Sequence, residues 1–175
     1  MQRIKSMFTL AVLGMCILGL STASLAADKF EKEVEKEKGA VKLIREVQRG
    51  GYDIITAAEL KNLIDSGQDI LVVDTMPYKA YKKIHVPGAK QFLFPIPEMG
   101  AWDTKETDGK SKKDYEALLG ADKHKTIIIY CGFVKCTRSH NGAVWAKTLG
   151  YKNVFRFSGG IFAWQGAKYP TEKIK

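Results

Sequence analysis

Apolar and polar positions follow two different periods along most of this chain. Short apolar runs rich in β-branched residues, typical of buried strands, alternate with segments whose apolar residues are three and four apart, as in helices. The predicted strands lie at 52–55, 70–73, 126–130 and 154–157, with an edge segment at 90–94. The predicted helices lie at 57–65, 78–83, 115–119, 139–149 and from 160 onward. This alternation predicts an α/β fold with a mostly parallel central sheet and helices on both faces.

Local signals mark some of the boundaries. Thr56 and Glu59 have the spacing of a reciprocal helix cap, and Ser66-Gly67 follows as a stop signal. Residues 95–113 combine proline, glycine and charge without a clear period, which predicts a long surface loop.

The first 26 residues have the pattern of a secretory signal peptide. Two basic residues precede an apolar run at 7–20, and small residues lead to a cleavage site after Ala26. The run is short for a membrane span. An uncleaved N-terminal anchor is one alternative, and a lipoprotein modified at Cys16 is another, although Met15 is large for the preceding position. Cleavage predicts an exported, periplasmic protein without stable membrane association.

Residues 27–51 form a charged extension that is predicted to be helical. Acidic and basic residues are mixed over 28–38, and an apolar stripe begins only at Val41. Such a run is typical of a solvated helix face. Gly50-Gly51 ends the segment, so the sequence predicts one folded domain at 52–175.

Charge and cysteine content narrow the chemistry. The formal net charge is +9, which favours small anionic substrates or acidic partners. The lysines are scattered rather than grouped with aromatic residues, so the composition does not indicate nucleic acid binding. Signal cleavage leaves two cysteines, Cys131 and Cys136, which would close too small a loop to brace the fold well. A chemical role is therefore favoured.

Cys131 is the main candidate for that role. It follows the predicted strand at 126–130 and precedes the predicted helix at 139–149. Ligands of open α/β sheets bind beyond the carboxyl ends of the strands, and a helix start stabilises negative charge. Lys135 and Arg138 add two cations, and Arg138 can hold an oxyanion through paired hydrogen bonds. We therefore expect Cys131 to have a lowered pKa and to attack an anionic substrate as a thiolate.

Other interpretations of the two cysteines stay open at this point. Cys131 can also be a buried structural cysteine, which is common at strand ends. Cys136 can be a resolving thiol, a redox partner of Cys131, or an inert loop residue.

Five motifs in chain order resemble the rhodanese family of thiosulfate and polysulfide sulfurtransferases, over residues 54–167. They are the helix start at 55–60, the strand end at 72–74, the turn at 84–89, the loop from Tyr130-Cys131 to Arg138-Ser139, and the C-terminal signature at 150–154, 159–161 and 163–164. The resemblance implies a rhodanese-like three-layer fold at 52–175.

The resemblance also implies a mechanism. Cys131 attacks the outer sulfur of a small anionic donor and becomes a persulfide, which a thiol or cyanide acceptor then consumes. The loop would bind the substrate through Gly132, Phe133, Val134, Lys135, Thr137 and Arg138. No metal and no organic cofactor is implied. Auxiliary roles fall to four further residues: Cys136, Asp74, His85 and His140.

The chain departs from the family pattern in three places. Cys131 and Arg138 are separated by six residues, whereas sulfurtransferases of this family usually have four and related phosphatases have five. Met76 stands where an arginine is common, and Ile84 replaces a glycine before His85. The longer loop puts the choice of substrate in question.

Three other activities therefore remain alternatives to sulfur transfer. The first is a module that binds sulfur without turnover. The second is a thiol redox protein that uses Cys131 and Cys136. The third is a phosphatase that depends on Cys131.

Overall fold

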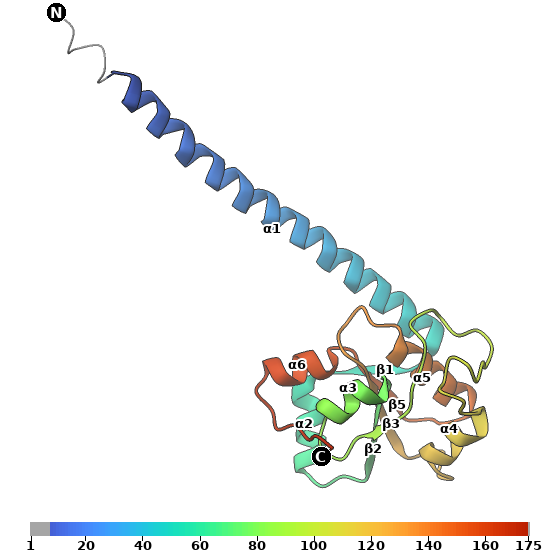
Figure 1. Cartoon of the computed structure of the whole chain (residues 1–175). Coiled ribbons are helices and arrows are strands. Elements are labelled where there is room, and N and C mark those ends of the chain that lie inside the picture. Colours follow the sequence, from blue (N-terminus) through green and yellow to red (C-terminus); the bar gives the residue numbers. More distant parts are fainter. Residues whose placement is uncertain (1–7, 175) are drawn as a thin grey trace, which may run out of the picture. The chain divides into compact units, whose positions relative to one another are not determined.

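The computed structural model describes residues 8–174, with side chains described for 28–174 (Figure 1). Helix α1 spans Phe8–Gly50, and two compact units divide the chain, Met1–Val41 and Lys42–Lys175. The predicted signal peptide and Cys16 lie outside the residues with described side chains. The second of the two compact units contains the predicted domain at 52–175 and the last turns of α1.

The charged part of α1 has the exposed character that its sequence predicts. Lys32 pairs with Asp28, Lys36 with Glu33, and Lys38 with Glu35, and all six side chains are exposed. Pairs three or four residues apart on an exposed helix face stabilise it by only a few tenths of a kcal/mol each. Between Asp28 and Ile174, no helix has both the length and the apolar composition that crossing a bilayer requires.

A five-stranded parallel sheet forms the centre of the unit at 42–175, which confirms the predicted fold class. Its strands lie in the order β1-β5-β4-β2-β3. Their bounds are β1 Asp53–Ile55, β2 Ile70–Asp74, β3 Lys90–Gln91, β4 Thr126–Tyr130 and β5 Val154–Phe157. The central strand, β4, pairs with β2 and β5, so its carboxyl end lies in the middle of one sheet edge.

The helices after α1 occur where the sequence predicts them. They are α2 Ala57–Asp65, α3 Tyr78–Lys83, α4 Lys112–Leu119, α5 Arg138–Thr148 and α6 Gly160–Gly166. The reciprocal cap of Thr56 and Glu59 is present at the start of α2. Ser111 and Asp114 make a second one at α4, which begins three residues earlier than the sequence indicated. Each such cap satisfies backbone N–H groups that have no partner within the helix.

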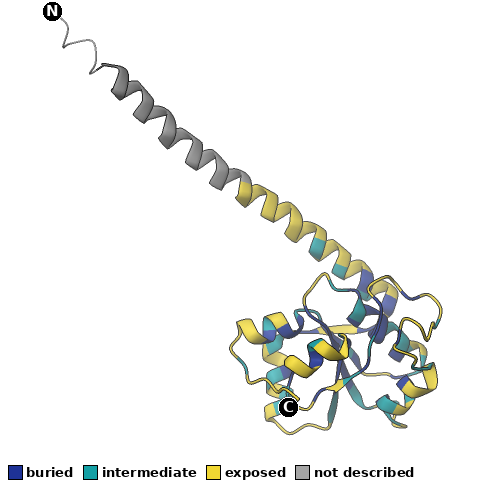
Figure 2. Cartoon of the chain, viewed as in Figure 1, coloured by how far each residue is buried: buried dark blue, intermediate teal, exposed yellow. Residues whose placement is uncertain are grey.

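Two apolar cores lie on the two faces of the sheet, since successive side chains of a strand point to opposite faces. Ile127 and Ile129 of β4 pack with residues of α4 and α5, whereas Ile128 and Tyr130 pack with residues of α2, α3 and α6. Figure 2 shows the buried strands between helices whose outer faces are exposed. The arrangement gives the three layers implied by the resemblance.

The segment at 95–113 is more buried than a surface loop. Thr107 is fully buried, and Met99 belongs to the core beside α5. Trp102 packs against the same core, and its indole Nε1–H donates to the carbonyl of Lys110 at 3.0 Å. The segment has no hydrophobic periodicity because its backbone is irregular, and these contacts hold it against the domain.

Candidate functional site

The segment Cys131–Arg138, called the cysteine loop below, connects the carboxyl end of β4 to α5. Its first two carbonyls are held by α6, because the N–H groups of Ile161 and Phe162 donate to Cys131 at 2.9 Å and Gly132 at 3.0 Å. This close approach depends on Gly160, whose φ is +58° and where an added Cβ would lie 2.2 Å from the Cys131 carbonyl oxygen. The loop therefore begins at a fixed place beyond the central strands.

Cys131 lies at the bottom of the cysteine loop and is fully buried. Its Sγ is 3.3 Å from the Ser139 hydroxyl oxygen and 3.5 Å from the Cys136 carbonyl oxygen. Burial raises the pKa of the Cys131 thiol, and the adjacent Cys136 sulfur raises it further. The expected lowering of this pKa is wrong, because desolvation outweighs the hydrogen bonds that the Ser139 hydroxyl and backbone N–H, in the first turn of α5, make to Cys131. The assignment of Cys131 as the nucleophile stays a prediction.

Cys136 has the environment that the sequence assigned to Cys131. Its side chain is partly exposed, and the thiol of Cys131 donates a hydrogen bond to its sulfur. The backbone N–H groups of Arg138 and Gly132 donate to the same sulfur. The hydrogen bond from Cys131, aided by these N–H groups and by the charge of Arg138, lowers the pKa of Cys136 to about 6. A thiolate at neutral pH is therefore expected at Cys136.

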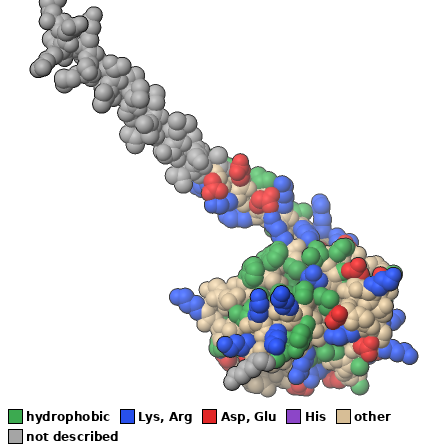
Figure 3. Space-filling view, in the orientation of Figure 1, with side chains coloured by type: hydrophobic (Ala, Val, Ile, Leu, Met, Phe, Trp, Pro, Cys, Tyr) green, Lys and Arg blue, Asp and Glu red, His purple; other side chains and the backbone are tan. Residues whose placement is uncertain are grey.

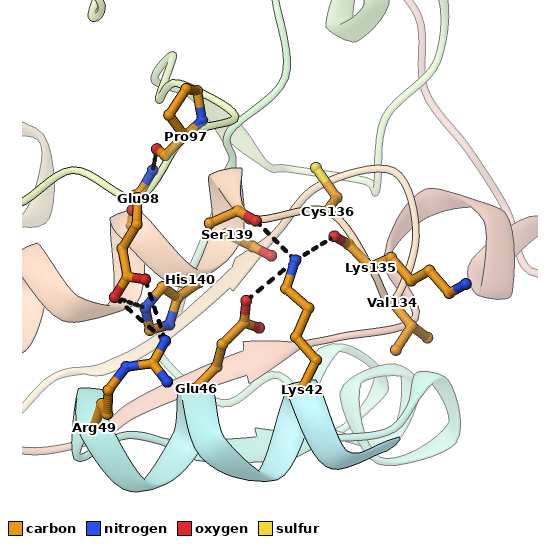
Figure 4. Close-up of polar contacts among 12 residues, drawn as sticks. Lys42, Glu46, Arg49, Pro97, Glu98, Val134, Lys135, Cys136, Ser139 and His140 are labelled. Carbon is orange, nitrogen blue, oxygen red and sulfur yellow. Dashed lines mark hydrogen bonds and ion pairs between the residues drawn. The ribbon is translucent and has the colours of Figure 1, made fainter. Parts of the chain in front are cut away.

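The outer part of the cysteine loop is held by two cations that share one carboxylate, and Figure 4 shows one of them, Lys42, with Glu46 and the Lys135 carbonyl. Arg156 of β5 donates to the carbonyls of Val134 at 3.2 Å and Cys136 at 2.9 Å, and it pairs with Glu46 of α1. Lys42 donates to the carbonyl of Lys135 at 3.0 Å and lies 3.4 Å from the same Glu46 carboxylate. Glu46 is thus bound to both cations that fix the loop backbone.

The other residues predicted to bind substrate have different surroundings. The Arg138 guanidinium donates to the carbonyl of Phe94, and its backbone N–H points to Cys136. Thr137 is nearly buried and precedes α5, and its hydroxyl accepts a hydrogen bond from Lys42 at 3.0 Å. Gly132 is buried between Cys131 and α6, whereas the Lys135 side chain is exposed. The backbone N–H groups of Gly132 and Arg138 help to lower the pKa of the Cys136 thiol.

The rim of the cysteine loop is apolar. Phe133 and Val134 are 48% and 41% exposed, and the Phe133 ring packs against Phe162 of α6 with centroids 5.6 Å apart. On the face in view in Figure 3, exposed hydrophobic side chains lie among Lys and Arg side chains.

Asp74 lies at the end of β2, next to Tyr130 of β4 in the register of the sheet. It is fully buried, and one carboxylate oxygen accepts the N–H of Met76 at 2.8 Å. Burial raises the pKa of Asp74 to about 6, despite that hydrogen bond. Asp74 therefore orders the backbone after β2 and contacts neither cysteine directly through a hydrogen bond in the described residues.

The two predicted auxiliary histidines lie away from the cysteine sulfurs. His85 Nδ1 is 2.8 Å from the Tyr81 carbonyl oxygen, and the His85 backbone pairs with Glu172. His140 is buried between Tyr52 and Glu98, with contacts of 2.8 Å and 3.3 Å, and desolvation lowers its pKa. Both histidines have the contacts of structural residues.

Sequence reasoning missed the residues that support the cysteine loop from beneath. Arg156 is fully buried, and the sequence analysis included it only as part of the strand at 154–157. Glu46 lies between Leu43 and Val47 on the inner face of α1, a signal that the charged composition of the helix masked. Ser139 was noted only as part of a motif, yet its hydroxyl contacts both Cys131 and Arg156.

A parallel α/β domain with a cysteine loop beyond its central strand defines the class of this protein. The rhodanese-like domain family model matches residues 56–167, and the chain belongs to this family. The family includes sulfurtransferases.

Relatives agree with that assignment. The chain is 29% identical, over 135 residues, to the chloroplastic rhodanese-like domain-containing protein 14 of Arabidopsis thaliana, and the match covers 61% of this chain and 59% of the relative. Among solved structures, it resembles the BH2092 protein of Bacillus halodurans, with a TM-score of 0.56, 24% identity, and coverage of 77% of this chain and 86% of that one. A thiosulfate sulfurtransferase of Pseudomonas aeruginosa gives a TM-score of 0.57 and 20% identity, with coverage of 78% and 23%. At these identities the structural likeness establishes the fold.

Proposed function

We propose that this protein is a sulfurtransferase that accepts sulfane sulfur from thiosulfate or a polysulfide and passes it to a thiol or cyanide. The sulfur is carried as a persulfide on a thiol of the cysteine loop. The observation that carries this proposal is the pair of free thiols in the loop that follows the central strand, with Cys131 buried and Cys136 partly exposed. The charge of Arg138, which helps to lower the pKa of Cys136, favours an anionic donor.

The choice between the two thiols rests on access and charge. By its position after β4, Cys131 is the thiol that the family resemblance predicts as the persulfide carrier. Its burial and its raised pKa disfavour direct attack on a dissolved donor. The lower pKa and partial exposure of Cys136 favour it as the thiol that first meets the donor. Cys131 then lies beneath it as a second thiol.

The test is the rate of thiocyanate formation from thiosulfate and cyanide. We expect turnover by the wild-type protein and only the uncatalysed rate with Cys131→Ser/Cys136→Ser, because no thiol is left in the cysteine loop. The variant Ser158→Ala, outside the cysteine loop, is expected to keep the wild-type rate. Equal rates for the wild type and the double variant would refute sulfur transfer through this loop.

We also propose, from residues 1–26 alone, that the protein is exported and acts in the periplasm. A small basic protein in that compartment would meet dissolved sulfur anions directly. Intact mass of the protein recovered from the periplasmic fraction is expected to correspond to a chain that begins at Ala27. Recovery of the uncleaved chain in the membrane fraction would instead support the N-terminal anchor.

A further inference from the structure

The thiols of the two cysteines in the cysteine loop lie close to each other and differ in burial. Cys131 is fully buried and Cys136 is partly exposed. The Cys131 thiol donates to the carbonyl oxygen of Cys136 at 3.5 Å, and the two thiols are close enough that each shifts the pKa of the other. A sulfur atom added to Cys136 on its exposed side would leave Cys131 in contact with the inner sulfur of the persulfide.

Ser139 and Arg156 position the buried thiol. Arg156 Nε–H donates to the Ser139 hydroxyl oxygen at 2.9 Å, and that oxygen lies 3.3 Å from Cys131 Sγ. Because the Arg156 hydrogen occupies a lone pair of the hydroxyl, the Ser139 hydrogen is available for the Cys131 sulfur. A hydrogen bond to sulfur favours its thiolate, the form in which a cysteine attacks. Ser139 is thus a positioning residue for Cys131.

We infer that Cys131 resolves a persulfide formed on Cys136, so that the loop releases hydrogen sulfide and closes as a Cys131–Cys136 disulfide. This inference rests on the proposed function, because it starts from sulfur that the loop has accepted. It assigns the protein a sulfide-releasing reaction in addition to transfer of sulfur to an outside acceptor.

The sulfur passes through two steps, its acceptance by Cys136 and its release when the disulfide forms. The Cys136 thiolate attacks the outer sulfur of thiosulfate, the S–S bond of the donor breaks, and sulfite leaves with the electron pair. The Cys131 thiol then attacks Cys136 Sγ and loses its proton, the persulfide S–S bond breaks, and the outer sulfur leaves as hydrosulfide with that proton. The two thiols are oxidised by two electrons, and the transferred sulfur is reduced from the sulfane to the sulfide level. An external thiol reductant reopens the disulfide for the next cycle.

The backbone of the cysteine loop is fixed on both sides of the reacting thiols, so the disulfide can form without a rearrangement of the loop. Backbone N–H groups of α6 fix the carbonyls of Cys131 and Gly132, while Arg156 holds the carbonyl of Cys136. The Cys136 backbone N–H also donates to the Phe133 carbonyl at 3.0 Å, so a tight turn brings the second cysteine back over the first. Closing the disulfide therefore joins two thiols that are already adjacent.

A single-turnover experiment without added thiol tests the inference. The full-length protein is reduced, separated from reductant under anaerobic conditions and mixed with thiosulfate, and sulfite, sulfide and intact mass are measured. For the wild type we expect one sulfite and one sulfide per chain and a mass lower by two hydrogens. For Cys131→Ser we expect sulfite without sulfide, and a retained sulfur that peptide mapping places on Cys136. For Cys136→Ser we expect neither product.

A third variant separates positioning from folding. Ser139→Ala is expected to slow sulfide release about tenfold, the effect of one lost hydrogen bond, and to slow sulfite release less than sulfide release. Wild-type protein that releases sulfite and keeps the sulfur without forming a disulfide would overturn the inference and leave the proposed function intact. Sulfur retained on Cys131 in Cys136→Ser would also overturn it. Absence of sulfite and of any mass change in every protein would refute the proposed function itself.

Discussion

Glu46 of α1 and Arg156 of β5, 110 residues apart in the sequence, form an ion pair whose side chains are 3% and 0% exposed. Charges that are this buried require partners, because desolvation costs several kcal/mol for each ion. Arg156 also binds two carbonyls of the cysteine loop, so the pair links the last turns of α1 to the candidate site. The C-terminal end of α1, which the sequence analysis described as part of a charged extension, is therefore a structural part of the domain.

Glu46→Gln is expected to lower the free energy of unfolding by about 3 kcal/mol or more, since it leaves Arg156 buried without a counter-charge. Urea denaturation of the purified protein measures the effect. Glu37→Gln is the matched control, because Glu37 lies on the same helix and is exposed, and it is expected to change stability by less than about 0.5 kcal/mol. Equal effects of the two substitutions would contradict a supporting role for Glu46.

Replacement of both partners separates stability from loop order. Glu46→Leu/Arg156→Met is expected to recover most of the lost stability, because apolar residues of similar volume often replace a buried ion pair at little cost. The carbonyls of Val134 and Cys136 still lose their donor, so sulfite release from thiosulfate is expected to slow. A double variant that is stable and fully active would show that Arg156 does not position the loop.

The pKa of Cys136 is predicted to depend on the thiol beneath it. Alkylation of the wild type by iodoacetamide is expected to rise with pH around a midpoint near the pKa of about 6, because only the thiolate reacts. Cys131→Ala removes the hydrogen bond and should move the midpoint to higher pH, whereas Cys131→Ser keeps a donor and should move it less. Identical profiles for the three proteins would rule out this coupling.

Gly160 is predicted to be irreplaceable where α6 meets the cysteine loop. Gly160→Ala places a Cβ 2.2 Å from the Cys131 carbonyl oxygen at a φ of +58°, and we expect a loss of stability of more than about 2 kcal/mol together with slower sulfur loading. Gly166→Ala is the control, since an added Cβ there has no heavy atom within 4 Å. It is expected to be neutral or slightly stabilising by thermal unfolding, and a similar loss in both variants would contradict the close approach.

Asp74 is predicted to make stability fall as the pH rises. Its pKa is raised from 3.8 to about 6 on folding, so the folded state binds this proton more tightly, and the stability it provides below pH 3.8 is lost as the pH passes 6. Asp74→Asn is therefore expected to be more stable than the wild type at pH 8, by about 3 kcal/mol at most, and to show little difference at pH 4. Urea midpoints at the two pH values measure this. The exposed control, Asp53→Asn, should show no comparable change, and a destabilised Asp74→Asn at pH 8 would contradict the assignment.

The alternation of strands and helices was predictable because β2 and β4 are apolar on both faces and α2 has apolar residues at helical spacing. The cap at Thr56 and the strand end before Cys131 were predictable for the same reason, since the relevant interactions are local. The irregular segment at 95–113 was not, because Trp102 and Thr107 are buried by contacts that leave no period in the sequence.

The site was predictable in place but not in its internal arrangement. The position of Cys131 follows from β4, whereas its burial and the approach of Cys136 depend on how the longer loop folds over it. The support from Glu46 and Arg156 depends on a contact between distant parts of the chain, and a charged residue in a charged helix gives no sign of such a contact. Local sequence patterns therefore predicted the position of the cysteine loop, whereas tertiary contacts determine which of its two thiols is exposed.

The most direct test of the account is the intact mass of Cys131→Ser after brief exposure to thiosulfate or polysulfide without reductant. This variant retains the partly exposed Cys136 and lacks the thiol inferred to remove its sulfur. We predict a mass increase of one sulfur atom that cyanide reverses and that maps to Cys136. An unchanged mass, with sulfur retained instead by Cys136→Ser, would contradict the account and return the role of sulfur acceptor to Cys131.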